Sequence, residues 1–484
     1  MNATIQDKFT DRKAIYYILL FVVLESANML FMESSFSILI TIPQIGIVLY
    51  LLIKNDIEGA LLWHLVFNLT ACDLNTTDDD IEMLSYPAIK LIGPLTISYI
   101  ILGLIWLKSL RIRVNIPKYT LFNRFRKVIW LFIGCGTIMG GVGLLSGFTI
   151  SNFIPPFRYM LVAVLLIDIF SRLYNAQFLQ RCYQLAICLL IASPIVSVLS
   201  FYFFELSYSY SVFESFLANA LFVLAPCMIL FLLYKTTRFV KISMLVSLVC
   251  FFMLTAVAAR GSQFITLGVA LIIIVYLVYF CRNKRDFVSI SFFRFLLPIC
   301  GVAFFFYGSF MLTNVGENLA SNKFSQFISL FSIFGAGGGS IIQLDEIGTS
   351  PYIRVAEVLN VIDNGLHNPF YLILGQGYGG YYTDSLGLFD GIDLSAGAFN
   401  DDAIRVGKFS TAHSMYPNVL LFHGLIGFFL IVKLGILYLK NIHYTPLIYA
   451  AFVLLLYSLY YNVPLMNACV LFLFASERKI RYHL

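Results

Sequence analysis

Histidine and arginine are the side chains of this sequence best suited to chemistry. His413 lies in the stretch Thr411–Met415, directly before a long apolar run, and an imidazole exchanges protons near neutral pH. Arg158, Arg260 and Arg354 stand in three different connections between apolar runs. A guanidinium binds phosphate through two parallel hydrogen bonds. These residues therefore predict an anion-binding site with a histidine as general base.

Each of these residues also has a purely structural interpretation. Arg158 and Arg260 could contact lipid head groups where spans end, and Arg354 could pair with Glu357, three positions on along a helix. His413 could simply make local hydrogen bonds at a helix start. The functional interpretation is favoured by the combination, because all four residues are predicted to reach the same membrane face.

The elements that must position these side chains are apolar segments. Of the 484 residues, 60% are hydrophobic and 12% are charged, whereas soluble proteins carry about 25% charged residues. Apolar runs near ~20 residues, the length that crosses a bilayer core, recur from end to end. We predict an all-α, polytopic integral membrane protein with about 14 transmembrane helices. The predicted spans are residues 14–32, 37–53, 57–73, 87–107, 128–150, 159–171, 182–204, 217–234, 242–259, 263–280, 295–312, 416–439, 446–461 and 464–476.

The distribution of basic residues predicts the orientation. If both termini are cytoplasmic, 24 of the 32 Lys and Arg residues fall on inside segments and six on outside segments, as the positive-inside rule expects. Glu25, Asp168 and Lys433 fall within or at the edges of spans, where we expect interior pairing or snorkelling rather than proton-coupled transport. The nine cysteines show no metal-ligand spacing and are interpreted as small buried hydrophobes.

Three regions follow from these spans. Residues 1–312 form a transmembrane bundle of about 11 spans, 313–413 a large periplasmic loop, and 414–484 about 3 further spans. Within the loop, Ser350-Pro351 and Asn364-Gly365 bound a stretch with helical spacing, so we predict a helix there. Gly335–Gly339 is interpreted as a hinge.

A glycine-rich stretch in the same loop, Leu374–Tyr382, contains Gly-x-Gly-x-x-Gly. It lacks the strand–turn–helix context of a dinucleotide site. We interpret it as a tight turn near the site, with Tyr378, Tyr381 and Tyr382 offering aromatic faces to sugars. His423, ten residues after His413, is expected only to pack.

Taken in order, these motifs resemble the bacterial O-antigen polymerases and ligases of the Wzy and WaaL type. Ala259-Arg260-Gly261 resembles the family's outer-turn arginine motif, and a large periplasmic loop with an early arginine follows it. Asn368–Gly379 resembles the loop's glycine-rich segment. Ala412–Gly427 resembles the histidine segment that ends the loop, with Ser414 where asparagine is usual. The resemblance covers residues ~255–430 and is the strongest signal in the sequence.

The resemblance implies a GT-C-like, metal-independent membrane glycosyltransferase without a cofactor, in the bacterial inner membrane with its active site on the periplasmic face. Its partners would be undecaprenyl-pyrophosphate-linked oligosaccharides as donor and acceptor, membrane lipids and a chain-length regulator, and no nucleic acid is expected. His413 would be the catalytic base, and Arg158, Arg260 and Arg354 would bind pyrophosphate. A polymerase is favoured over a ligase acting on lipid A–core. A lipid-linked glycan flippase or other transporter is the third alternative.

Overall fold

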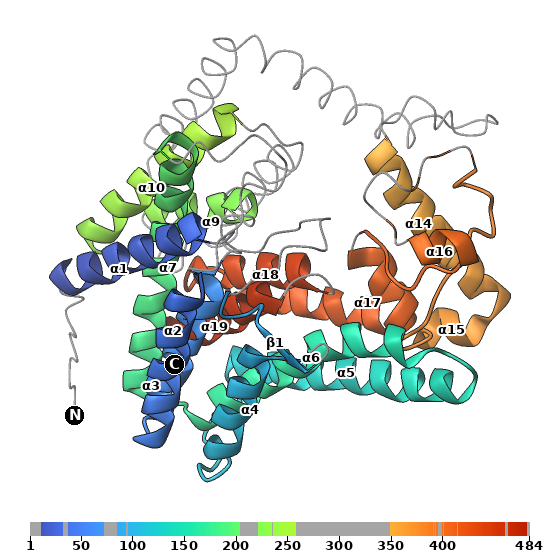
Figure 1. Cartoon of the computed structure of the whole chain (residues 1–484), viewed down its shortest axis with the longest axis horizontal. Coiled ribbons are helices and arrows are strands. Elements are labelled where there is room, and N and C mark those ends of the chain that lie inside the picture. The colour runs from blue at the N-terminus through green and yellow to red at the C-terminus, as the bar shows by residue number, and fades with distance from the viewer. Residues whose placement is uncertain are drawn as a thin grey trace.

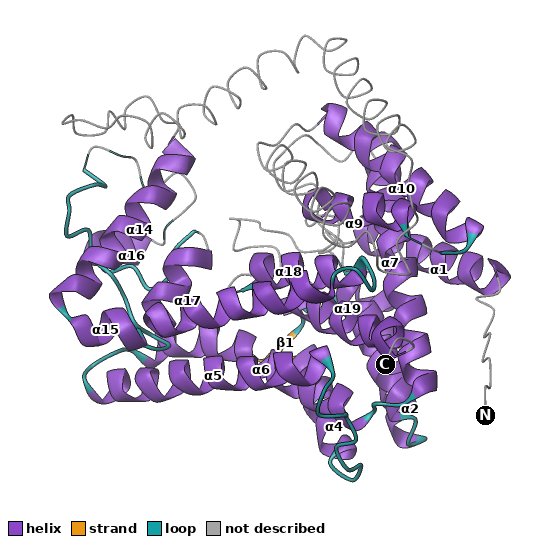
Figure 2. Cartoon of the chain, turned by 180° about the vertical axis from the view of Figure 1, so that it is seen from behind, coloured by secondary structure: helices purple, strands orange, loops and turns teal. Residues whose placement is uncertain are grey.

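The protein is helical almost throughout in the computed structural model (Figure 1; Figure 2). The structure describes residues 11–31, 37–71, 85–92, 95–203, 221–234, 236–257, 349–390, 392, 394, 399, 401–413, 415–459 and 463–481. Arg260, the predicted spans 263–280 and 295–312, and the Gly335–Gly339 hinge lie outside these residues.

The first part of the chain forms nine helices and a small hairpin within the described residues. They are α1 (Asp11–Phe31), α2 (Ser37–Ile53), α3 (Ile57–Leu69), β1 (Lys90–Ile92), β2 (Leu95–Thr96), α4 (Ile97–Ser109), α5 (Leu121–Leu145), α6 (Ile150–Arg172), α7 (Ala176–Phe203), α9 (Leu221–Leu233) and α10 (Arg238–Val257). Among these, α5, α6 and α7 are long and apolar enough to cross a membrane.

The second part begins with the loop helices α14 (Thr349–His367), α15 (Pro369–Leu374) and α16 (Asp401–Val406). It continues with α17 (Met415–Asn441), α18 (Leu447–Ser458) and α19 (Val463–Arg481). The long, apolar α17 is the fourth helix of the described chain that could span a membrane. The helix predicted within the loop is confirmed as α14. Its predicted cap residues lie in its first and last turns.

Some span boundaries were predicted wrongly. The stretch 87–107 is not one helix, because β1 pairs antiparallel with β2 before α4 begins at Ile97. The span predicted at 159–171 is longer, because α6 begins at Ile150 and continues through Pro155 and Pro156. The span predicted at 128–150 ends at Leu145. Helices α3 and α4 have 13 residues each, a rise of ~20 Å that is shorter than a hydrocarbon core of ~30 Å.

Helix α19 forms the centre of the core. It packs against α3, α5, α6, α7 and α18, and its residues from Leu465 to Ala475 are buried. The ring of Phe474 contacts Phe122, Phe170 and Phe178 at centroid distances of 5.2, 4.6 and 5.6 Å. A helix that is apolar on all sides is stable only when neighbours surround it, and this packing explains why the last helix lies inside the bundle.

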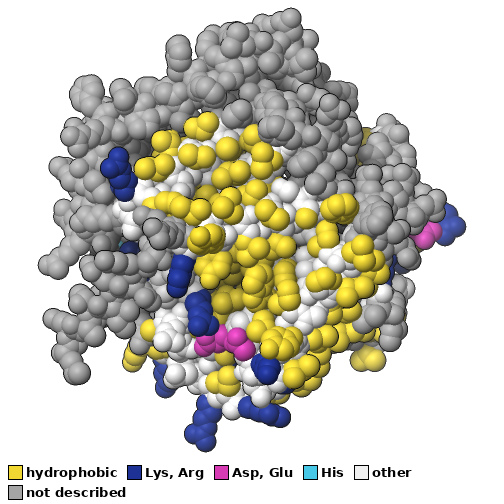
Figure 3. Space-filling model, turned by 60° about the vertical axis from the view of Figure 1, so that its left-hand side comes forward, with side chains coloured by type: hydrophobic (Ala, Val, Ile, Leu, Met, Phe, Trp, Pro, Cys, Tyr) yellow, Lys and Arg dark blue, Asp and Glu magenta, His cyan; other side chains and the backbone are white. Residues whose placement is uncertain are grey.

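Apolar side chains also cover much of the outer surface. Figure 3 shows a broad hydrophobic face with Lys and Arg along one rim. On α5, Leu131, Ile138 and Leu145 are 58%, 69% and 91% exposed. A soluble protein rarely leaves so large an apolar surface in water, and the distribution is typical of a membrane-embedded bundle.

The relative orientation of helices α5 and α17 defines the two ends of the bundle. Phe125 contacts Tyr438 and Phe132 contacts His423, so α5 and α17 run antiparallel. Their basic residues gather at one end, where α5 begins with Arg124 to Lys127 and α17 ends after Lys440. We call this the basic end. The opposite end carries α14, α15 and α16, and we call it the loop end (Figure 1).

Asp168, an acid within a predicted span, is paired as expected. Its carboxylate accepts hydrogen bonds from Trp106 Nε1 at 2.9 Å and Arg172 Nε at 2.8 Å, and it lies 4.0 Å from the Arg126 guanidinium. The side chains of Asp168 and Arg172 are 11% and 16% exposed. The cluster joins α4, α5 and α6 at the basic end.

We expect Asp168→Ala to lower the free energy of unfolding by roughly 2–4 kcal/mol, because it leaves a mostly buried guanidinium without its carboxylate. The thermal unfolding midpoint in detergent measures this loss. Asp402→Ala is the matched control, because the Asp402–Arg405 pair is 79% and 78% exposed and should contribute nothing measurable. Equal midpoints for both variants would contradict the structural role of the Asp168 cluster.

Candidate functional site

The central feature of the loop end is a contact between His413 and Glu357. His413 Nδ1 lies 2.5 Å from Glu357 Oε1, and the backbone N–H of His413 donates to both carboxylate oxygens at 2.9 Å. The Tyr382 hydroxyl donates to Oε1 at 3.3 Å. The Glu357 side chain is fully buried and the His413 side chain is 24% exposed. We call this pair the Glu357–His413 dyad.

The hydrogen bonds around Glu357 indicate the protonation pattern of the dyad. An ionised carboxylate only accepts hydrogen bonds, and a backbone N–H and a hydroxyl already donate to this one. The matching imidazole tautomer carries its proton on Nδ1 and leaves a lone pair on Nε2. Nε2 is buried and makes no hydrogen bond within the described part of the chain. The dyad is therefore a base whose orientation is fixed by a carboxylate and whose Nε2 is covered by protein in this conformation.

Three structural devices hold His413 in place. The Asn418 side chain, in the first turn of α17, donates to the Ala412 carbonyl at 2.8 Å and accepts from the Ala412 N–H at 2.9 Å. An antiparallel bridge joins Tyr382 to Phe409, four residues before the histidine. The Phe399 ring packs edge-on against the imidazole, at a centroid distance of 4.6 Å. The prediction that His413 lies just before a helix is confirmed, because α17 begins at Met415.

The structural alternative for Arg354, a pair with Glu357 on a solvated helix face, is not what the structure shows, because the Glu357 side chain is fully buried. Glu357 lies on the buried face of α14, between the buried residues Ala356 and Asn360. A carboxylate on the apolar face of an amphipathic helix is a signal that could have indicated its role. Its partner lies 56 residues away in the chain, so helical spacing could not identify it.

The arginines predicted to bind pyrophosphate are placed differently from one another. Arg354 is exposed on α14, one turn before Glu357, so it shares a helix with the dyad. Arg158 lies on α6, with its guanidinium 5.4 Å from the Tyr99 ring centroid and 5.3 Å from that of Tyr159. Arg260 lies outside the described residues. Arg354 therefore lies on the helix that carries Glu357, and Arg158 lies at the contact between α4 and α6.

The glycine-rich stretch is a wedge between two helices rather than a simple surface turn. We call residues 375–378 the wedge. The Gln376 and Gly377 N–H groups donate to the carbonyls of Leu421 and Phe422 on α17 at 2.7 and 3.1 Å. The Tyr378 N–H donates to the Gly136 carbonyl on α5 at 3.0 Å. Irregular backbone of this kind is stable inside a membrane bundle only when its polar groups find such partners.

A break in α17 supplies two of these carbonyls. Gly424 has φ 58° and ψ −157°, which interrupts the helical path. The N–H groups that would have bonded to Leu421 and Phe422 are thereby displaced, and the wedge replaces them. Gly424 is required at this point because a Cβ there would meet the Ile373 carbonyl at 2.5 Å.

The tyrosines of the glycine-rich stretch do not all face outward as predicted. Tyr378 and Tyr382 are fully buried, so they offer no face to a sugar in this conformation. Tyr381 remains partly exposed, and Lys408 Nζ lies 4.5 Å from its ring centroid. His423 packs as expected, stacked on Phe132 at 3.7 Å and buried.

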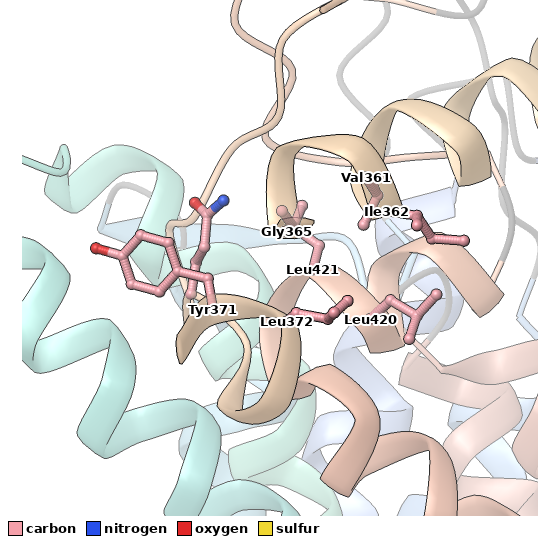
Figure 4. Close-up of a pocket in the computed structure, with 8 residues that line it drawn as sticks. Val361, Ile362, Gly365, Tyr371, Leu372, Leu420 and Leu421 are labelled. Carbon is pink, nitrogen blue, oxygen red and sulfur yellow. The ribbon is translucent and has the colours of Figure 1, made fainter. Parts of the chain in front are cut away.

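A small, shallow pocket lies between α14, α15 and α17, one helical turn beyond the dyad. Its lining residues are Val361, Ile362, Gly365, Tyr371, Leu372, Gln376, Leu420 and Leu421. In Figure 4 the leucine side chains gather between the helices while Tyr371 extends away from them. The mostly apolar lining of this pocket therefore lies next to the dyad, on the side of the wedge.

Comparisons of the chain with family models, curated proteins and solved structures find no match. The class of the protein accordingly rests on its structure. It is a predominantly helical protein whose described residues include four long apolar helices suited to a membrane, and a partly helical segment at the loop end bears a histidine–carboxylate dyad.

Proposed function

We propose that the chain is a membrane glycosyltransferase that joins undecaprenyl-pyrophosphate-linked repeat units into a surface polysaccharide, as an O-antigen polymerase does. The loop end would face the periplasm, and about 14 helices would span the inner membrane. The observation that carries this proposal is the Glu357–His413 dyad, because it pairs the predicted base with a buried carboxylate. A histidine held this way is suited to general-base catalysis.

In the proposed reaction, a sugar hydroxyl of the acceptor attacks the anomeric carbon of the donor. His413 Nε2 takes the hydroxyl proton, and Glu357 stabilises the imidazolium that forms. The bond between the anomeric carbon and the phosphate oxygen breaks, and lipid pyrophosphate leaves with the bonding electrons. Arg354 and Arg260 would bind that anion, and Arg158 would support it from α6. The new glycosidic bond replaces the phosphate ester.

The proposal is tested by reconstitution. The purified full-length protein is placed in liposomes with undecaprenyl-pyrophosphate repeat units alone, and products are separated by length. A ladder from the wild-type protein supports a polymerase. If product forms only after lipid A–core is added, the protein is a ligase and the polymerase proposal is wrong. If folded protein yields no product with either acceptor but moves the lipid-linked glycan across the bilayer, the transporter alternative is correct.

A further inference from the structure

The loop carries an exposed apolar corner where α14 meets α15. Leu366, Phe370 and Ile373 are 61%, 55% and 49% exposed, and we call these three residues the α15 corner. None of the residues of α15 is buried, and none is charged. A helix of a water-facing loop would carry polar side chains on its open face. The corner therefore requires an apolar partner.

The position of α15 indicates what that partner is. The Ile373 carbonyl abuts Gly424, and the wedge that follows α15 bonds to Phe422. From Met415, where α17 begins, Gly424 lies ~13 Å along the helix at 1.5 Å per residue. On α5, Gly136 lies ~13 Å before the helix ends at Leu145. Two helices long enough to span a membrane thus place the end of α15 beside them rather than beyond their ends.

The α15 corner also continues an apolar surface. On α5, Ile138, Val142 and Leu145 are exposed at the same height along the helix, on the side away from the wedge. On α17, Leu425 and Phe429 are exposed just past the break at Gly424. Figures 1 and 2 both place α15 next to the loop end of α5 and α17. The corner is thus adjacent to exposed apolar residues of α17, because Ile373 abuts Gly424.

We propose that the α15 corner is inserted among the lipid acyl chains of the membrane leaflet at the loop end. The loop is then held at two points, through the wedge to α5 and α17 and through this corner to the bilayer. Glu357 lies on the same helix as Leu366, so the docked corner fixes the height of the dyad relative to the lipid surface. This inference concerns membrane docking and does not depend on the reaction that the protein catalyses.

The test is lipid photo-crosslinking of the full-length protein in liposomes. p-Benzoylphenylalanine is introduced separately in place of Phe370 and Ile373, and adducts with phosphatidylglycerol and phosphatidylethanolamine are measured by intact mass. Leu386 and Val406 are the matched controls, because they are exposed apolar residues elsewhere in the loop, at 47% and 60% exposure. Size-exclusion profiles verify that all four variants remain folded.

We expect lipid adducts at positions 370 and 373 that exceed those at 386 and 406 several-fold. Equal yields at all four positions, or no lipid adduct at 370 and 373, would overturn the proposal. A crosslink from 370 or 373 to a second copy of the chain would overturn it as well, because the corner would then be a protein interface.

Discussion

Replacement of His413 with alanine is expected to lower the rate of glycan transfer by ~10²–10⁴-fold, the usual contribution of a general base. The loss should appear in kcat with little change in KM, because the imidazole acts on the reacting hydroxyl and not on substrate binding. The measurement is the initial rate of ladder formation by protein in liposomes. His367→Ala is the matched control, because His367 lies in the same loop with a 76% exposed side chain.

Glu357→Gln tests whether the carboxylate orients the base. A glutamine offers one acceptor oxygen, whereas the Glu357 carboxylate accepts from both Nδ1 and the backbone N–H of His413. The amide would also favour the tautomer with the proton on Nε2, which cannot act as a base. We expect kcat to fall by ~10²-fold or more with an unchanged thermal midpoint. A normal ladder from folded His413→Ala or Glu357→Gln would remove the dyad from the mechanism.

The sequence predicted those features whose signals are local. The α14 helix was foreseen because Ser350-Pro351 and Asn364-Gly365 mark its ends within the helix itself. The position of His413 before α17 was foreseen because the apolar run begins immediately after it. The α5 and α17 spans were foreseen in outline because ~20 apolar residues identify them.

The features that the sequence did not predict depend on contacts between distant segments. Glu357 was considered only as an alternative partner for Arg354, three residues away, whereas its partner in the structure comes 56 residues later. The wedge was interpreted as a turn because its acceptors are carbonyls freed by the break at Gly424, which no pattern within the wedge reveals. The hairpin before α4 was merged into a span although Gly93-Pro94, between its strands, is a local turn signal.

The wedge leads to the second large prediction, Gly377→Ala. Gly377 has φ +78°, and a Cβ there would lie 1.9 Å from the Gly140 backbone nitrogen on α5. The left-handed backbone alone costs ~1–2 kcal/mol for alanine, and a backbone clash in a packed interior adds ~1–3 kcal/mol. We expect the free energy of unfolding of the variant to fall by most of its value, and its transfer activity to be lost with it. The thermal midpoint and the initial rate of ladder formation measure the two losses.

Two matched controls separate the clash from the backbone strain. Gly407 has φ +67°, and a Cβ there would meet no described atom within 4 Å, so Gly407→Ala should incur only the backbone cost. On α5, a Cβ at Gly140 would meet the Tyr378 carbonyl at 2.5 Å, whereas a Cβ at Gly141 would face open space among the described residues. Gly140→Ala should therefore incur the clash without the left-handed backbone cost, and Gly141→Ala should be close to neutral. If Gly140→Ala and Gly141→Ala behaved alike, the wedge would not lie between α5 and α17, and the dyad would lack the support that positions it.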